Sequence, residues 1–298
     1  MRSRTNGMTL PESPDRTWWK VALTTLAVVV LVVVAILAAS LSEALLSPSH
    51  EGLGAVVGAL VGTLITWGGL WLLLVKMRRH GRGELGMTVY RMPFGLALGA
   101  GIGLLSAFSA FGIAVASGAY SVTFDGSPSW AVVGSLVLST FVHAYFEELA
   151  FRSGLVGSLL RRVPAPIAIL VPALLFGAAH LGNPGASAIG TFNTIVLGLA
   201  LGAMFLPVSG GKRSLGLVTG WHAGWNLAVA LCGTAVSGTS STLWASAEPV
   251  GPLWWTGGEY GLEGSLATSI VAVVVLAGAA LRVRNASPEP KADLPVAS

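Results

Sequence analysis

The chain has 298 residues, of which 53% are hydrophobic and only 10% are charged, and its mean hydropathy is +0.75. Soluble domains carry about 25% charged residues, so this composition excludes an ordinary soluble globular protein. The net charge of +4 comes without a basic tract interleaved with aromatic residues, which argues against a nucleic-acid partner. Cys232 is the only cysteine, which excludes an internal disulfide and a cysteine-based metal site.

Apolar runs divide the chain into helices. A helix needs about 20 apolar residues to cross the hydrocarbon core of a bilayer. Eight segments have this character, the fifth of them short: Trp18–Leu41, Leu53–Val75, Phe94–Ala116, Trp130–Ala150, Pro166–Leu181, Ile189–Pro207, Leu215–Val236 and Leu266–Leu281. We therefore predict an all-α fold, a polytopic transmembrane bundle of about eight helices.

The predicted bundle comprises residues 18–284, between an N-terminal tail at 1–17 and a disordered C-terminal tail at 285–298. The first apolar stretch, 21–39, is longer than the core of a secretory signal, so we expect a retained helix. Residues 153–163 either continue the fourth helix or lie at the membrane interface.

Positive charge alternates along the chain. Lysine and arginine occur in both tails and in the loops after the second, fourth and sixth spans. The opposite loops, 42–52, 117–129, 182–188 and 237–265, contain neither residue. Because cytoplasmic loops are enriched in lysine and arginine, this pattern predicts a multi-pass protein of the cell membrane with both termini cytoplasmic. The lipid bilayer is then its first partner.

Few ionisable residues fall within the predicted spans, and such residues are functional candidates because burying them in a membrane is costly. Together with the strongly hydrogen-bonding Asn226, they are His143, Glu147, Glu148, Arg152, His180 and His222.

Spacing brings several of these side chains together. Glu147 and His180 each lie 17 residues from the turn at 163–164, so antiparallel helices place them at one depth, roughly 25 Å from the turn. His222 and Asn226 are four residues apart and share a helix face. The depth of His222, about ten residues into its helix, matches only loosely unless the fourth helix projects into the cytoplasm.

The two adjacent acids are expected to differ in role. Glu148 and Arg152 have the spacing of an intrahelical ion pair. Glu147 has no basic partner in its own turn and is therefore available as a general base. His143, one turn earlier, is expected to support it.

Three motifs carry a family resemblance. Residues 146–152 contain EExxxR, residues 176–180 read FxxxH, and residues 222–226 read HxxxN. In this order on separate membrane helices, they resemble the motifs of the CPBP intramembrane protease family, which groups CAAX prenyl endopeptidases with bacteriocin-processing and immunity (Abi) proteins. The resemblance covers roughly residues 130–236 and implies a catalytic core there.

The resemblance also implies roles. Glu147 and His180 would activate a water, His222 and Asn226 would stabilise an oxyanion, and Glu148, Arg152 and His143 would support them. No cofactor is certain, although Glu147, His180 and His222 could supply three ligands to a divalent metal such as zinc. The HExxH helix of many zinc proteases is absent.

The function predicted from these residues is that of an intramembrane endopeptidase, which hydrolyses a membrane-associated or prenylated-type substrate with an activated water. The sequence does not identify the peptide or protein substrate. The alternative is a non-catalytic immunity or assembly factor on the same scaffold. A proton-coupled transporter would also use membrane Glu and His, but would show broken helices in paired halves.

Other polar and aromatic residues have plainer expectations. Trp221 and Trp225 should pack in the core, with a substrate groove as the minority interpretation. Trp244, Trp254 and Trp255 resemble an interfacial belt. The glycines in 99–103 should allow close helix approach, and His50 and His80 should be solvated in loops.

Overall fold

A computed structural model describes residues 18–46, 51–87, 92–124, 130–207, 213–239 and 245–285. In chain order its main elements are α1 (Trp18–Leu46), α2 (Glu51–Leu70), the π-helix η1 (Trp71–Met77), α3 (Met92–Ala116), β1 (Tyr120–Phe124), α4 (Trp130–Glu148), the π-helix η2 (Leu149–Val156), α5 (Gly157–Leu159), α6 (Ala165–Ala179), α7 (Ala188–Phe205), α8 (Leu215–Leu231), β2 (Ala245–Pro249), α9 (Leu253–Thr256) and α10 (Leu266–Arg284). Each of the eight predicted helical segments is a helix. The predicted tails lie outside the described residues, apart from Asn285.

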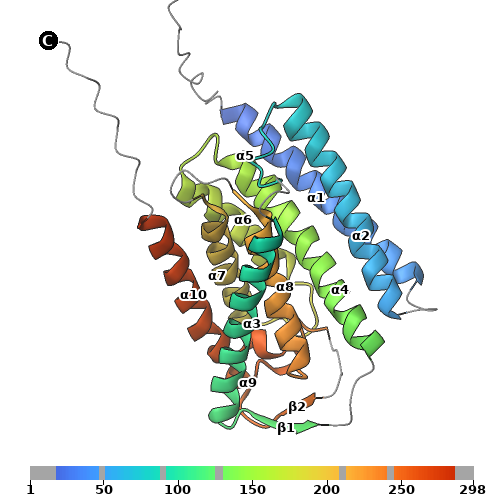
Figure 1. Cartoon of the computed structure of the whole chain (residues 1–298), viewed down its shortest axis with the longest axis vertical. Coiled ribbons are helices and arrows are strands. Elements are labelled where there is room, and N and C mark those ends of the chain that lie inside the picture. Colours follow the sequence, from blue (N-terminus) through green and yellow to red (C-terminus); the bar gives the residue numbers. More distant parts are fainter. Residues whose placement is uncertain are drawn as a thin grey trace, which may run out of the picture.

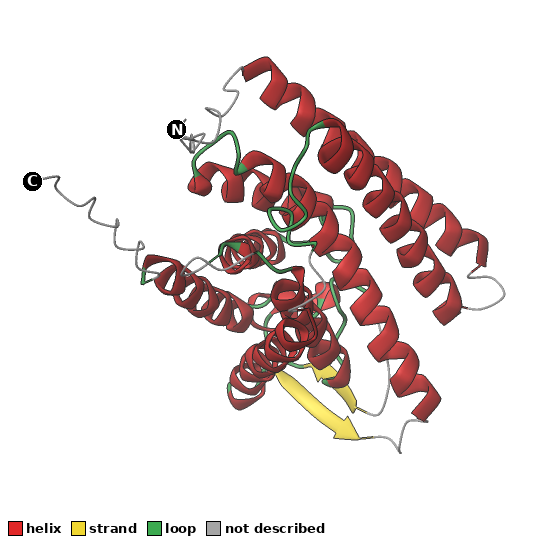
Figure 2. Ribbon diagram, turned by 45° about the horizontal axis from the view of Figure 1, so that its top comes forward, coloured by secondary structure: helices red, strands yellow, loops and turns green. Residues whose placement is uncertain are grey.

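The helices form a bundle with a hairpin on one side. α3 and α8 pack together near the centre, α6, α7 and α10 lie to one side, and α4 crosses to the pair α1–α2 (Figure 1). Figure 2 shows that the α1–α2 hairpin runs along α4 at the edge of the molecule. The position of α4 between hairpin and bundle gives it neighbours on both faces.

Five helical stretches are long and apolar enough to cross a membrane. They are Ala22–Leu46, Val56–Met77, Met92–Ala116, Ala188–Phe205 and Leu266–Arg284. Many of their large apolar side chains point outward, including Leu37 at 64% exposure and Leu64 at 70%. A bilayer would cover such surfaces. α6 is apolar but shorter, and α4 and α8 contain the polar motif residues, so the predicted number of eight spans is not established.

Glycine faces hold α3 against α8. A Cβ atom at Gly99 would lie 2.1 Å from the Leu217 carbonyl oxygen, and one at Gly103 would lie 2.1 Å from the Trp221 carbonyl oxygen. On the facing helix, a Cβ at Gly220 would lie 2.2 Å from the Leu96 carbonyl oxygen. Only glycine fits at this separation, so the close helix approach predicted for residues 99–103 is confirmed.

A two-stranded sheet corrects the all-α prediction. β1 pairs antiparallel with β2, with Tyr120 opposite Pro249 and Phe124 opposite Ala245. The sheet lies at the end of the bundle near α9 (Figure 1). An isolated strand pair is marginal in water, but the Tyr120 hydroxyl donates to the Thr256 carbonyl and anchors this one to the bundle. The sequence offered little sign of a pairing between two loops so distant along the chain.

Charged side chains gather at the end of the bundle opposite the two-stranded sheet. Arg161 donates from Nε to Glu84 Oε2 at 2.6 Å, and Arg213 donates to the Glu84 carbonyl. His80 lies beside them and is only 3% exposed, so the prediction that it is solvated is wrong. Neither of its ring nitrogens has a hydrogen-bond partner among the described residues. Its Nδ1 lies 3.8 Å from Glu84 Oε2, beyond hydrogen-bond distance.

The glycine contact gives a test of the bundle. Gly103→Ala should lower the free energy of unfolding by roughly 1–3 kcal/mol, because the added methyl group meets a backbone carbonyl. Gly101→Ala is the matched control, since a Cβ there has no neighbour within 4 Å. Unfolding in detergent can be followed by circular dichroism of the helices. Equal stability of the two variants would contradict the contact.

The buried histidine predicts a pH dependence. Burial and the nearby Arg161 guanidinium lower the pKa of His80 from 6.5 to about 4. Between these values the unfolded chain binds a proton that the folded chain refuses, so stability falls as pH decreases from about 7 to 4, by up to roughly 3 kcal/mol. His80→Phe should flatten this part of the stability–pH curve, measured by unfolding in urea at each pH. Parallel curves for the two proteins would refute the assignment.

Candidate functional site

The two acids of the first motif end α4 and face different surroundings. Successive residues on a helix point about 100° apart. The Glu147 side chain is 29% exposed, whereas that of Glu148 is fully buried. The chain continues directly into the buried π-helix η2, a widened helical form that often occurs at functional sites. Burial therefore separates two chemically identical neighbours into an accessible and an inaccessible carboxylate.

Glu148 is the centre of a buried polar cluster. Arg152 NH1 donates to Glu148 Oε1 at 3.0 Å, so the predicted ion pair is present. His222 Nδ1 lies 2.9 Å from the same oxygen and donates to it. Arg152 also donates to the Gly198 carbonyl of α7 at 3.3 Å and lies over the Phe176 ring at 4.8 Å. This one carboxylate thus links α4 to α7 and α8.

His222 reaches both acids. Its Nε2 lies 3.6 Å from Glu147 Oε2, beyond hydrogen-bond distance but close enough for strong attraction when the ring is charged. The loose depth match expected for His222 is therefore resolved, since the ring lies beside both carboxylates. The edge of the His222 ring also meets Phe176, with ring centroids 6.1 Å apart.

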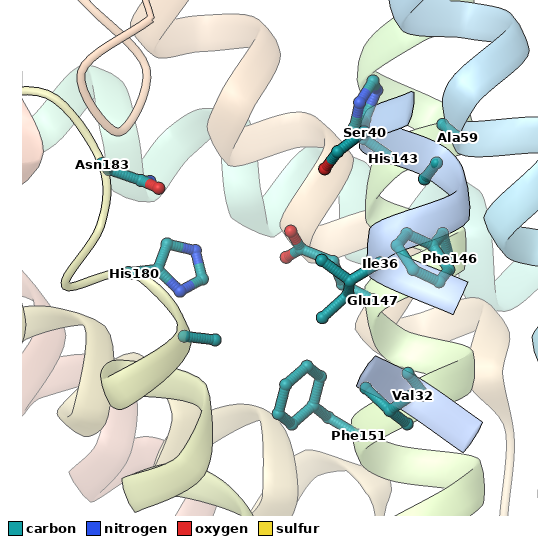
Figure 3. A pocket seen from close by; sticks show the side chains of 13 residues that line it. Val32, Ile36, Ser40, Ala59, His143, Phe146, Glu147, Phe151, His180 and Asn183 are labelled. Carbon is teal, nitrogen blue, oxygen red and sulfur yellow. The ribbon is translucent and has the colours of Figure 1, made fainter. Parts of the chain in front are cut away.

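His180 follows the last turn of α6. Its Nδ1 donates to the Phe176 carbonyl at 2.7 Å, and its ring lies 4.6 Å from the Phe176 ring. In the neutral ring this leaves Nε2 as a proton acceptor. Figure 3 shows the Glu147 carboxylate pointing from α4 towards the His180 ring across a pocket. The two side chains predicted to lie at one depth thus face the same space.

Two cavities adjoin these residues. The larger, of 330 Å³, lies between α4, α8 and the segment 236–239. It is lined by all four predicted catalytic residues, Glu147, His180, His222 and Asn226. The smaller, of 200 Å³, lies between α1, α4 and the end of α6. His143, Glu147, His180 and Asn183 line both cavities.

His143 takes a place beside the acid. Its Nδ1 donates to the Ser139 carbonyl one turn earlier, at 3.1 Å. This bond orients the ring, which lines both cavities one turn from Glu147.

A second buried carboxylate was not predicted. Glu263 is 8% exposed, and it accepts from Trp225 Nε1 at 2.8 Å and from the Ser237 hydroxyl at 2.8 Å. Ser237 adopts a φ of 47°, and its carbonyl accepts from the Asn183 side chain at 3.1 Å. Asn183 and Ser237 both line the larger cavity, so Glu263 holds its wall. Helical spacing could not predict the burial of Glu263, because this acid lies in a loop and not in one of the predicted helices.

The motif tryptophans pack as expected. Trp221 and Trp225 are each 1% exposed and stack with ring centroids 5.3 Å apart. Neither lines the larger cavity, so the substrate-groove interpretation has no support there. Trp254 is 52% exposed, whereas Trp244 lies outside the described residues.

Glu147, His180 and His222 are the residues that could hold a metal ion. Within the described ranges, no three His, Cys, Asp or Glu side chains are grouped closely enough to hold one. His222 and His180 donate from Nδ1 to Glu148 and to the Phe176 carbonyl, bonds that leave Nε2 of each ring available as a ligand atom. As the side chains lie among the described residues, Glu147, His180 and His222 are not grouped closely enough to form a three-ligand metal site.

Comparison with known proteins agrees with the motif pattern. Residues 128–228 match the family model described as Type II CAAX prenyl endopeptidase Rce1-like. The match covers about a third of the chain and contains all three motifs, so the recognition made from the motifs is confirmed. No curated protein and no solved structure gives a significant match.

The buried cluster predicts that the stability of the fold depends strongly on Arg152. Arg152→Met should destabilise the protein by about 3–5 kcal/mol, because Glu148 keeps its buried charge but loses its guanidinium. The double variant Glu148→Leu/Arg152→Met should recover part of this loss. Arg161→Met is the control, since its pair with Glu84 is about 40% exposed and worth at most about 1 kcal/mol. Chemical unfolding in detergent measures all three.

The double variant decides the interpretation of that cluster. A double variant as unstable as Arg152→Met would mean that the lost packing, and not the unpaired charge, causes the effect.

Proposed function

We propose, from the premise that residues 128–228 carry the sequence of the Rce1-like type II CAAX prenyl endopeptidases, that this chain is an intramembrane endopeptidase. The family is one of peptide hydrolases. One observation carries the proposal: Glu147, an accessible carboxylate, shares a cavity with His180, His222 and Asn226.

In the proposed reaction, Glu147 is the general base. A water between the Glu147 carboxylate and His180 Nε2 attacks the carbonyl carbon of the scissile peptide bond, and Glu147 takes the proton of that water. His180 accepts a hydrogen bond from the water and orients it, because its own Nδ1 proton is committed to the Phe176 carbonyl.

The negative charge then develops on the former carbonyl oxygen. His222 Nε2–H and the Asn226 amide would donate to it, an interaction often worth about 2.7–4 kcal/mol per donor. His222 already donates from Nδ1 to Glu148, so donation from Nε2 as well requires a doubly protonated ring. The buried Glu148 carboxylate compensates that charge. Glu147 finally delivers its proton to the peptide nitrogen, the C–N bond breaks, and a carboxylate and an amine are released.

The orientation of the protein in the membrane follows from the position of its positive charges. The basic cluster around Arg161 and Arg213 lies at the end away from the sheet, where α1 begins and α10 ends (Figure 1). By the positive-inside rule we propose that this end is cytoplasmic, together with both termini. The substrate would then be a membrane-associated or prenylated-type peptide that reaches the site within a multi-pass membrane protein.

The four motif side chains face one cavity, and this arrangement favours a hydrolase over a non-catalytic immunity or assembly factor. Such a factor would need its polar residues at an interface with a partner. Here they face a shared cavity, with a buried ion pair behind them.

The central test replaces the proposed base. Glu147→Gln should lower the rate of peptide cleavage at least ~100-fold, because an amide cannot accept the water proton. His180→Ala and Asn226→Ala should lower it by roughly 10²–10³-fold. Purified protein in liposomes is incubated with membrane-protein extract, and new peptide ends are counted by mass spectrometry.

Glu248→Gln is the matched control, because this acid is exposed on β2 and lines neither cavity. Thermal unfolding must show that every variant is folded. Unchanged cleavage by Glu147→Gln would end the proposal. Activity that a chelator removes and zinc restores would instead contradict the metal-free route.

A further inference from the structure

The two cavities that adjoin Glu147 share four lining residues at the proposed site. Together they are called the groove, and each cavity is one half of it. The residues that line only the 330 Å³ half are mostly polar: Ser139, Thr140, Asn226, Ser237 and Thr239 among them. Those that line only the 200 Å³ half are mostly apolar: Val32, Ile36, Ala59, Phe146 and Phe151 among them. Beyond the four shared residues, a peptide in this groove would therefore meet mostly polar side chains in one half and mostly apolar side chains in the other.

The apolar half depends on the N-terminal hairpin. Val32 and Ile36 come from α1 and Ala59 from α2, opposite the α4 residues of the pocket. Figure 3 shows Ile36 and Phe151 at the edge of the space that Glu147 and His180 face. The hairpin packs along α4, η2 and α5, so α1 closes the pocket without being part of the central bundle (Figure 2). It also lies outside residues 128–228, the segment that matches the family.

Size and charge limit what this half can hold. Pockets for whole small molecules usually begin near 300 Å³, so a volume of 200 Å³ suits one large side chain better than a long hydrocarbon chain. No lysine or arginine lines either half among the described residues. Among its described lining residues, the 200 Å³ half therefore has no lysine or arginine to compensate an acidic side chain beside the scissile bond.

We propose that Ile36, with Val32 and Ala59, determines substrate specificity. The apolar half receives one large apolar side chain of the residue next to the scissile bond, and the polar half receives main chain beyond it. The inference rests on the proposed function, since it assigns the substrate class of the same site. Selection by size follows, because one methylene more or less in such a pocket changes rates by roughly 10–200-fold.

Two substitutions at Ile36 should shift specificity in opposite directions. Ile36→Ala enlarges the pocket and should favour Phe or Trp over Val at the selected position by tenfold or more. Ile36→Trp fills the pocket and should favour Ala or Val. Leu37→Ala and Leu37→Trp are matched controls, because Leu37 is the next residue on α1 but is 64% exposed and does not line the pocket. Neither control should change the preference.

The experiment uses the full chain in phosphatidylcholine liposomes and a proteome-derived peptide library as the probe. Cleavage sites are identified by mass spectrometry, and Glu147→Gln defines the background. A farnesylated peptide is added as a second probe. Opposite shifts for the two Ile36 variants, with unchanged Leu37 controls, are the expected result.

Several outcomes would overturn the inference. Ile36 variants that keep the wild-type preference, or that slow all peptides equally, would show that Ile36 has only a structural role. Cleavage confined to the farnesylated probe and insensitive to Ile36 would show that the pocket does not select a side chain. A wild-type protein without Glu147-dependent cuts on either probe would refute the proposed function itself, before any α1 variant is compared.

Discussion

The buried Glu148 carboxylate is the interaction on which the rest of the site depends. A charge without water is tolerated only when opposite charges and hydrogen bonds surround it. Arg152 and His222 supply them from α4–η2 and from α8. Arg152 extends the cluster to the α7 backbone. Three helices therefore cannot shift independently without exposing an unpaired charge, and their relative positions are fixed where the chemistry is proposed.

This cluster leaves Glu147 without a hydrogen bond from either partner. Arg152 and His222 Nδ1 both donate to Glu148, whereas Glu147 has only His222 Nε2 at 3.6 Å and turns into the cavity with its carboxylate partly exposed. A base must meet water, whereas a supporting acid must be shielded from it. The helix achieves both with adjacent residues, because its geometry turns them about 100° apart.

The remaining parts of the fold position the second wall. Glycine faces draw α3 onto α8, which fixes the helix that carries His222 and Asn226. At the sheet end, Glu263 ties Trp225 to Ser237, and Ser237 in turn holds Asn183 at the cavity. On the opposite side the α1–α2 hairpin closes the apolar half of the groove. Each wall of the groove thus comes from a different segment of the chain.

Sequence alone determined the helical segments, the membrane character of the chain, the ion pair of Glu148 with Arg152 and the motif residues, because these depend on composition and on helical periods of three to four residues. Only the tertiary structure decided that His222 bonds to Glu148, that His80 is buried, that β1 pairs with β2 and that Glu263 accepts from Ser237 behind the cavity wall. Those contacts join residues that are distant in the chain or that lie in loops. No local pattern encodes them, because they form only when the packed helices exclude water and bring their ends together.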